Sequence, residues 1–376
     1  MKVLILTVPA GGGHYHTAKA IKEHLSRDAK TECRILDVAK HGNKFVSAVI
    51  SKGYVLVSTY LPWGYRFFYN LMDKRTRHSY TFVSYLLDLL LGKKLTEYIK
   101  EYKPEVIVST HLFATVVLNL QAKKHKTDAK LISIITDFTV HPMWEQAKSD
   151  YFITASELLN DEAEKKFTTT QNVLPLGIPI KSSFIQTMPK DDACKKANIE
   201  NKFTVLVMMG SFGYGNAAGK IIQKLDNLEE DFQIIVVCGS NERMKKKIES
   251  QNFKKEVIVY GFCENISELM DCCDCIVTKP GGLSLSEALA KNTPIILTNA
   301  IPGHEERNLK LIKKCGAGVC INRRFTVDKA VSKLINSEQY REELIKNSRD
   351  LAKPDATRSL AELIYKIKSH KAERLG

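Results

Sequence analysis

Short apolar runs separated by helical segments recur along the chain, and this alternation constrains the fold more than any other sequence feature. The runs lack the period-two pattern of half-exposed strands, so they predict strands buried on both faces. Such strands form parallel sheets covered by helices, which predicts an α/β fold. The expected strands are Val3–Val8, Cys33–Val38, Val106–Ser109, Leu131–Thr136, Tyr151–Thr154, Asn172–Leu174, Thr204–Met209, Gln233–Cys238, Val257–Tyr260, Cys275–Thr278 and Pro294–Leu297.

A turn-rich stretch, Leu176–Ala193, divides this pattern into two halves because it contains a glycine and two prolines. The chain of 376 residues also exceeds what one ordinary hydrophobic core accommodates. We therefore expect two α/β domains. Helices such as Thr17–Ser26 and Phe113–Lys124 are expected between the strands of the first.

The most informative local motif is a strand, Cys275–Thr278, followed by a glycine turn and a helical pattern. Backbone N–H groups at such a helix start, here near Gly281 and Gly282, attract a phosphate. We expect Glu287 in the first helical turn, where its carboxylate would accept hydrogen bonds from a ribose. An alternative stays open, because Ser284 and Glu287 also have the spacing of a capping box.

Two more glycine-rich turns follow predicted strands, at residues 10–16 and 210–215. The first suggests a dinucleotide site, with Asp37 as the ribose-binding acid. However, His16 stands where the third glycine of that motif is required, so the match is weak. The second is another potential phosphate site or an ordinary turn.

A polar cluster, residues 136–144, follows the fourth predicted strand. Asp137 comes directly after this strand, where the carboxyl ends of parallel strands collect ligands. Together with His141 and Trp144 it fits a carbohydrate or acyl-chain pocket. The alternative is that Asp137 is an ordinary turn or cap residue.

The segment Lys44–Leu87 interrupts the alternation with many aromatic and basic residues and a single acid. Its aromatic residues include Trp63, and its densest group of basic residues is Lys74, Arg75 and Arg77. Aromatic rings beside cations suit an interfacial segment on an anionic membrane, and the chain's formal net charge of +14 also implies an anionic partner. The alternative is that the rings are core and the cations ordinary surface.

The nine cysteines show no disulfide framework. Cys272 and Cys275 form a lone C-x-x-C, whereas a zinc site requires a second pair, so we expect buried or partly buried free thiols. No apolar run has the length of a membrane span, and the N-terminal run lacks a signal-peptide cleavage pattern. We expect a cytoplasmic protein that binds the inner face of the cell membrane peripherally.

Six motifs follow one another in a fixed order over both halves of the chain: Gly11–His14, Thr136–Trp144, Gly177–Pro179, Gly210–Gly213, Pro280–Glu287 and Pro302–Asn308. Together they resemble those of the glycosyltransferase family of monogalactosyldiacylglycerol synthase and the bacterial diacylglycerol glucosyltransferases. The resemblance implies a GT-B fold, in which two Rossmann-like domains have parallel sheets facing an interdomain cleft. It places an acceptor and membrane-binding domain at 1–186, a nucleotide-sugar domain at 187–354, and a C-terminal helix returning to the first domain at 355–376.

The resemblance also implies roles for individual residues. The nucleotide would be bound by Gly210, Ser211, Phe262, Gly281, Gly282 and Glu287, and the donor sugar by His304, Glu305 and Asn308. The acceptor would contact Gly12, Gly13, His141 and Trp144. The composition of Lys44–Leu87, and not the resemblance, assigns Trp63, Lys74, Arg75 and Arg77 to the membrane. Relatives commonly carry glutamine at the position of His304, so the identity of the sugar stays open.

The expected activity is inverting transfer of a hexose from UDP-glucose or UDP-galactose to diacylglycerol or a glycosyldiacylglycerol. Direct displacement needs a base on the acceptor hydroxyl, and His14 and Asp137 are the unranked candidates. We expect no metal, no cofactor beyond the UDP-sugar donor, and no nucleic-acid partner. The alternatives are a UDP-N-acetylglucosamine transferase or epimerase of the same fold, and a non-catalytic basic binding protein.

Overall fold

The computed structural model describes residues 1–8, 11–42, 47, 85–122, 127–167, 172–210, 217–298 and 300–373, the last five without side chains. It contains two compact units. Unit 1 consists of Met1–Ser182, Pro302–His304 and Lys353–Gly376, and unit 2 of Ser183–Ile301 and Glu305–Ala352. Within the described residues, no helix is long and apolar enough to cross a membrane.

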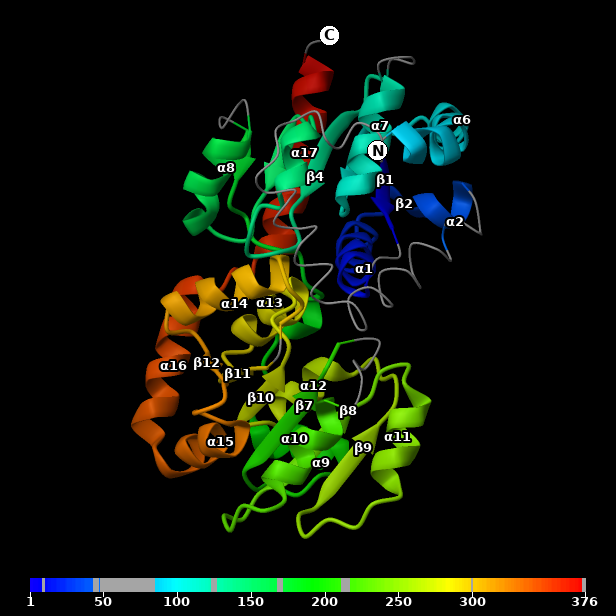
Figure 1. Cartoon of the computed structure of the whole chain (residues 1–376). Coiled ribbons are helices and arrows are strands. Elements are labelled where there is room, and N and C mark those ends of the chain that lie inside the picture. Colours follow the sequence, from blue (N-terminus) through cyan, green and yellow to red (C-terminus); the bar gives the residue numbers. More distant parts are fainter. Residues whose placement is uncertain are drawn as a thin grey trace. The chain divides into compact units, whose positions relative to one another are not determined.

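Unit 1 is built on a six-stranded sheet with the order β2-β1-β3-β4-β5-β6 (Figure 1). All of its pairings are parallel, so the carboxyl ends of the strands share one edge. The strands are β1 (Lys2–Thr7), β2 (Glu32–Asp37), β3 (Val106–Ser109), β4 (Lys130–Ile134), β5 (Tyr151–Ile153) and β6 (Val173–Leu174).

Successive residues of β1 point to opposite faces of this sheet, and each face packs on its own helices. Val3 and Ile5 pack on α1 (Gly13–Leu25) and α17 (Ala356–Glu373). Leu4 and Leu6 pack on the opposite side, against α6 (Lys93–Tyr102), α7 (Leu112–Ala122) and the π-helix η1 (Asp88–Gly92). Unit 1 therefore has three layers. The remaining elements are α2 (Val38–Gly42), α8 (Asn160–Lys166), η2 (Pro142–Gln146), η3 (Glu157–Leu159) and η4 (Ser182–Phe184), the last spanning the boundary between the units.

Unit 2 repeats the pattern with a second parallel sheet, whose order is β12-β11-β10-β7-β8-β9. Its strands are β7 (Thr204–Met208), β8 (Gln233–Val237), β9 (Val257–Tyr260), β10 (Cys275–Thr278), β11 (Ile295–Leu297) and β12 (Val319–Cys320). Its helices are α9 (Lys190–Ala197), α10 (Ala217–Leu225), α11 (Glu242–Glu249), α12 (Ile266–Asp271), α13 (Gly282–Ala290), α14 (His304–Lys314), α15 (Val327–Asn336) and α16 (Glu338–Leu351). The first residue of α14, His304, is counted with unit 1.

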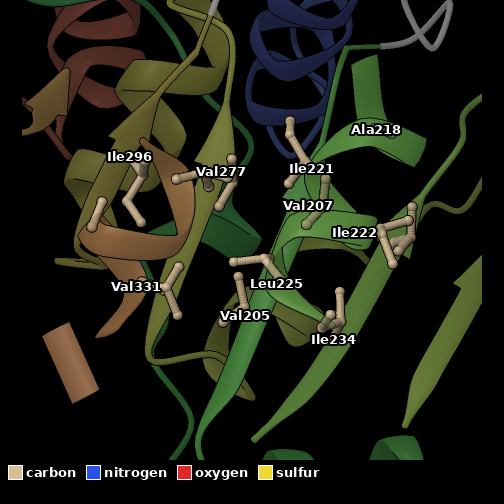
Figure 2. Packing of buried hydrophobic residues seen from close by; sticks show 14 of the residues in the cluster. Val205, Val207, Ala218, Ile221, Ile222, Leu225, Ile234, Val277, Ile296 and Val331 are labelled. Atoms are coloured by element: carbon tan, nitrogen blue, oxygen red, sulfur yellow. The ribbon is translucent and has the colours of Figure 1, made fainter. Parts of the chain in front are cut away.

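One face of the second sheet packs on α10, α11 and α15 in a continuous apolar cluster (Figure 2). Val205 and Val207 of β7 contribute from the sheet, and Ile222 and Leu225 from α10, all with no exposed surface. Because β-branched side chains fill the interior strands, this packing fixes where each strand ends and hence where the loops beyond it begin.

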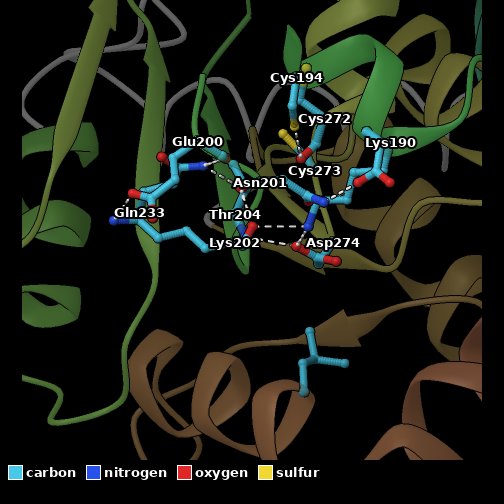
Figure 3. A network of polar contacts seen from close by, with 12 residues as sticks. Lys190, Cys194, Glu200, Asn201, Lys202, Thr204, Gln233, Cys272, Cys273 and Asp274 are labelled. Carbon is cyan, nitrogen blue, oxygen red and sulfur yellow. Dashed lines mark hydrogen bonds and ion pairs between the residues drawn. The ribbon is translucent and has the colours of Figure 1, made fainter. Parts of the chain in front are cut away.

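A polar network covers the amino-terminal end of the same sheet (Figure 3). Asp274 Oδ2, just before β10, accepts hydrogen bonds from the Thr204 amide at 2.7 Å and the Lys190 ammonium at 2.5 Å. Gln233 Nε2 donates to Thr204 Oγ1 at 2.8 Å. These side chains connect α9 to β7, β8 and β10, so this end of the sheet is occupied by structural contacts.

The cysteines behave as core thiols, as the sequence predicts, because all nine are free and buried or half-buried. Cys275 opens β10 with no exposed surface, and the Cys272 thiol donates to the Glu268 carbonyl at 3.2 Å. Burial, reinforced by the neighbouring Cys194, raises the pKa of Cys272 to about 12. A protonated thiol is a poor metal ligand or nucleophile, so these residues are packing groups.

The two Rossmann-like units confirm the predicted fold class, and every predicted strand is present within two residues at either end. The two-residue strand β12 was not predicted. Most of the predicted membrane segment, Lys44–Leu87, lies outside the described residues.

Candidate active site

The first group of polar residues lies at the topological switch point of unit 1. The chain leaves β1 for β2 on one side and returns in β3 on the other, so the loops after β1 and β3 diverge there. Such a point is where open parallel sheets bind ligands. Gly11 turns the chain with a φ of 83°, and α1 begins at Gly13 with Gly12 as its N-cap. His14 is thereby the second residue of the helix.

His14 is held from the two neighbouring strands. Its Nδ1 atom lies 2.8 Å from the Thr110 carbonyl oxygen, after β3, and 2.8 Å from Thr136 Oγ1, after β4. A carbonyl oxygen only accepts hydrogen bonds, so Nδ1 carries the proton and donates it to Thr110. In the neutral ring the lone pair then belongs to Nε2, which is the form required of a general base.

Burial is the largest influence on the ionisation of two neighbouring histidines, His14 and His111. Burial lowers its pKa from the usual 6.5, while the nearby Asp137 charge acts in the opposite direction. His111 stacks edge-on against it, with ring centroids 4.5 Å apart, and is buried deeply enough that its pKa is well below 6.5. His111 Nδ1 accepts from the Phe113 amide at 3.1 Å. At neutral pH both rings are therefore uncharged.

The other predicted acceptor residues surround this cluster. His141 caps the short helix η2, where its Nδ1 accepts from the Met143 amide at 3.1 Å. Trp144 is buried, with its ring edge-on to Phe152 at 6.2 Å. Their roles toward an acceptor stay predictions, as do those of Gly12 and Gly13.

The second group lies at the corresponding switch point of unit 2, where β7 and β10 are neighbours. Gly210 follows β7 with a φ of 77°. Lys279 directly follows β10, and its aliphatic stem passes over that glycine: a Cβ at Gly210 would lie 2.8 Å from Lys279 Cε. The Lys279 side chain thus contacts the start of the glycine turn after β7, and Lys279 itself leads into the glycine turn after β10.

The helix after β10 begins earlier than the capping-box pattern indicates. The first residue of α13 is Gly282 and its N-cap is Gly281, without a side-chain cap. Ser284 therefore lies inside the helix, and Glu287 lies in its second turn, so both the capping box and the first-turn position of Glu287 were wrong. Glu287 is half-buried, and its contact with a ribose remains a prediction.

Two of the three predicted sugar ligands are buried in contacts with the protein itself. Glu305 is 2% exposed and accepts from Lys279 Nζ at 2.6 Å and from the Ile301 amide at 2.8 Å. Asn308 has no exposed surface and donates to the Pro280 carbonyl at 2.9 Å. The third, His304, is half-buried at the start of α14.

Phe262 follows β9 and exposes 58% of its surface. Its contact with uracil stays a prediction. Ser211, Trp63, Lys74, Arg75 and Arg77 lie outside the described residues.

Sequence reasoning assigned no role to four residues of these groups: Thr110, His111, Thr136 and Lys279. Each comes directly after a strand or within two residues of its end. That position is the only local signal, and it becomes informative once the order of the strands is known.

Comparison with solved structures identifies the fold. MurG of Acinetobacter baumannii superimposes with a TM-score of 0.63 at 15% identity, covering 97% of this chain and 99% of that one. The UDP-GlcNAc 2-epimerase of Neisseria meningitidis, solved with UDP-GlcNAc, gives a TM-score of 0.63 at 15% identity, covering 97% of this chain and all of the other. The protein has the GT-B fold that such enzymes share.

Sequence relatives identify the family. Residues 14–180 match the family described as monogalactosyldiacylglycerol (MGDG) synthase, and residues 189–351 match glycosyl transferases group 1. The processive diacylglycerol beta-glucosyltransferase of Bacillus subtilis (strain 168) is 30% identical over 97% of this chain and 95% of its own length. Its counterpart in Bacillus licheniformis is 28% identical over 93% of this chain and 90% of its own length. The chain therefore belongs to the glycosyltransferase family of the diacylglycerol glucosyltransferases and monogalactosyldiacylglycerol synthases, as the sequence motifs predicted.

Proposed function

We propose that this glycosyltransferase moves glucose from UDP-glucose to the hydroxyl of diacylglycerol, or of a glycosyldiacylglycerol, with inversion at the anomeric carbon. The observation that carries the proposal is the position of the His14 imidazole at the switch point of unit 1. Its Nδ1 is held by Thr110 and Thr136, which leaves Nε2 as the nitrogen that can accept a proton. Glucose is proposed over galactose because a relative named as a beta-glucosyltransferase matches 97% of the chain.

The chemistry asked of unit 1 is proton removal. The acceptor oxygen forms a bond to the anomeric carbon as the bond from that carbon to the diphosphate oxygen breaks. The electron pair of the broken bond leaves with UDP. The acceptor proton passes to a base, and we assign this role to His14 Nε2. The nearby Asp137 carboxylate stabilises the resulting imidazolium, because its charge already raises the pKa of His14.

The chemistry asked of unit 2 is binding of the nucleotide and stabilisation of the leaving diphosphate. The helix α13 starts directly after the Gly281–Gly282 pair, so its N-terminal amides and dipole favour an anion. With this positive end beside the donor, we propose that the reaction uses neither a metal nor a cofactor.

The acceptor resides in a membrane, and we propose that the protein reaches it by peripheral, salt-sensitive binding to the inner face of the cell membrane through Lys44–Leu87. The described residues at the end of this segment and just beyond it support the proposal, because large apolar side chains are exposed there. Tyr85, Leu86, Leu89 and Leu90 expose 62%, 45%, 69% and 38% of their surfaces, and two lysines follow. Apolar anchors beside cations are typical of interfacial segments.

The function is tested by incubating the protein with radiolabelled UDP-glucose, UDP-galactose or UDP-N-acetylglucosamine, with and without vesicles containing diacylglycerol. We expect lipid-extractable label from UDP-glucose, and only when diacylglycerol is present. Label that appears only from another sugar corrects the donor. Conversion of the UDP-sugar without a lipid product would instead favour an epimerase.

The membrane proposal is tested by sedimentation with vesicles. The triple substitution of Lys74, Arg75 and Arg77 by Glu is expected to release the protein from anionic vesicles while UDP binding is retained. Binding that is indifferent to salt, lipid charge and this substitution would show that the segment is ordinary core and surface.

A further inference from the structure

We propose that Lys279 is the cation that stabilises the departing diphosphate of the donor, and that Glu305 is its positioning residue rather than a ligand of the donor sugar. This inference rests on the proposed function and specifies two residues of its donor site. Neither residue is explained by the predicted roles, since Lys279 had none and Glu305 is almost fully buried.

The position of Lys279 is fixed by the sheet. It is the first residue after β10, the strand that neighbours β7 at the switch point of unit 2. Its stem crosses Gly210, where a Cβ would lie 2.8 Å from Cε and 3.8 Å from Nζ. The glycine therefore leaves the space that the lysine occupies. Its ammonium lies beside the start of one glycine turn, two residues before the Gly281–Gly282 turn that opens α13.

Glu305 holds this ammonium in place. Its Oε1 atom accepts from Lys279 Nζ at 2.6 Å, and its Oε2 atom accepts from the Ile301 amide at 2.8 Å. A carboxylate with 2% exposure whose two oxygens are both engaged within the protein is poorly suited to bind sugar hydroxyls. The Lys279 side chain keeps 18% of its surface exposed and that of Glu305 only 2%, so the lysine is the more accessible of the two to an anion.

A second contact rigidifies the same loop. Asn308 Nδ2, one helical turn after Glu305, donates to the Pro280 carbonyl at 2.9 Å. The helix α14 thus holds both Lys279 and the residue after it. An ammonium fixed before the reaction stabilises developing charge without the cost of reorganisation, which is the physical basis of electrostatic catalysis.

In the reaction, the electron pair of the broken bond to the anomeric carbon stays on the β-phosphate oxygen of UDP. Lys279 would donate a hydrogen bond to this diphosphate and remain protonated throughout. The acceptor proton goes to the base of unit 1, so the step balances without a further reactant. This contact is made to phosphate and not to the nucleoside, and that difference makes the inference testable.

The test compares the binding of UDP and of uridine by calorimetry. Lys279→Gln alone would leave the Glu305 carboxylate buried without its cation, which destabilises the fold. The informative variant is therefore the neutralised pair Lys279→Gln with Glu305→Gln. We expect its UDP affinity to fall roughly 10- to 100-fold, as for the loss of a charged hydrogen bond, while uridine affinity is unchanged. Lys279→Arg should retain most of the UDP affinity.

A matched control is available at the other end of the same sheet. The Lys190–Asp274 pair has a similar N–O distance of 2.5 Å but lies at the amino-terminal end. Its neutralised variant, Lys190→Gln with Asp274→Asn, removes one charge of each sign and should leave UDP affinity unchanged. Glu305→Gln alone should give a UDP affinity between those of the wild type and the neutralised Lys279–Glu305 pair, because the ammonium loses its charged anchor.

Equal UDP affinities in the wild type and the neutralised Lys279–Glu305 pair would overturn the inference and leave the proposed function standing. Equal losses for UDP and uridine would also overturn it, since they indicate a structural role. Wild-type protein that binds UDP through Lys279 but transfers nothing to diacylglycerol would contradict only the proposed function. Wild-type protein that binds no UDP would contradict both.

Discussion

Replacement of Gly210 by alanine tests the geometry of the donor site in both stability and binding. The residue has a φ of 77°, and a side chain in this left-handed region costs about 1–2 kcal/mol. The lower entropy of an unfolded alanine returns about 0.4–1 kcal/mol. The added Cβ would also lie 2.8 Å from Lys279 Cε, so the lysine must move. We expect a net loss of about 1 kcal/mol in unfolding free energy, together with weaker UDP binding.

Gly219, inside α10, provides the matched control. No atom lies within 4 Å of the position its Cβ would take, and it is not among the described glycines with positive φ. Gly219→Ala should therefore stabilise the protein by about 0.4–1 kcal/mol, because alanine lowers the conformational entropy of the unfolded chain. Urea denaturation of both variants, with equal m-values, measures the difference. Gly210→Ala that is as stable as Gly219→Ala and binds UDP normally would refute the proposed arrangement of Gly210 and Lys279.

Three further predictions concern other parts of the molecule. The Lys291 side chain is 1% exposed and donates to both carboxylate oxygens of Asp271 in a buried ion pair. Lys291→Met should lower the unfolding free energy by about 3–5 kcal/mol in urea denaturation, and a loss below about 1 kcal/mol would contradict this. Burial lowers the pKa of His111 well below 6.5, so the unfolded chain takes up the proton first and stability falls as the pH drops below 6.5. His111→Asn keeps an acceptor for the Phe113 amide. The free energy of unfolding of this variant should fall by about 1.4 kcal/mol less than that of the wild type between pH 7.5 and 5.5. An unaltered pH dependence would show that His111 does not cause this loss of stability. Treatment with EDTA should leave the initial transfer rate unchanged, and activity restored only by added metal would show that the donor site requires one.

The fold was predictable because the strands are apolar runs whose burial on both faces leaves few alternatives. Local signals failed where tertiary contacts decide. The Ser284–Glu287 spacing indicated a capping box, yet α13 starts at Gly282, where Asn308 anchors the preceding Pro280 carbonyl. A capping box describes only its own helix, and a contact from another helix is absent from that pattern.

The site was predictable in part. His14 and Asp137 were recognisable because each belongs to a motif at a strand end, and the structure brings them near each other. Thr110 and His111 carry no such motif, and they become neighbours of His14 only through the order β2-β1-β3. The resemblance assigned Glu305 a contact with the donor sugar, which stays a prediction. Its pairing with Lys279, 26 residues away, required the structure.

The central claim is tested most directly by the rate of glucose transfer to diacylglycerol vesicles in the wild type and in the His14→Asn and Asp137→Asn variants. The product should be a β-glucoside by NMR, formed with equimolar UDP. Loss of the base should reduce turnover in His14→Asn by about 10²- to 10⁴-fold, with UDP affinity unchanged and a smaller reduction in Asp137→Asn. Near-normal turnover in His14→Asn, or a wild-type protein that forms no glycolipid from any UDP-hexose, would contradict the account.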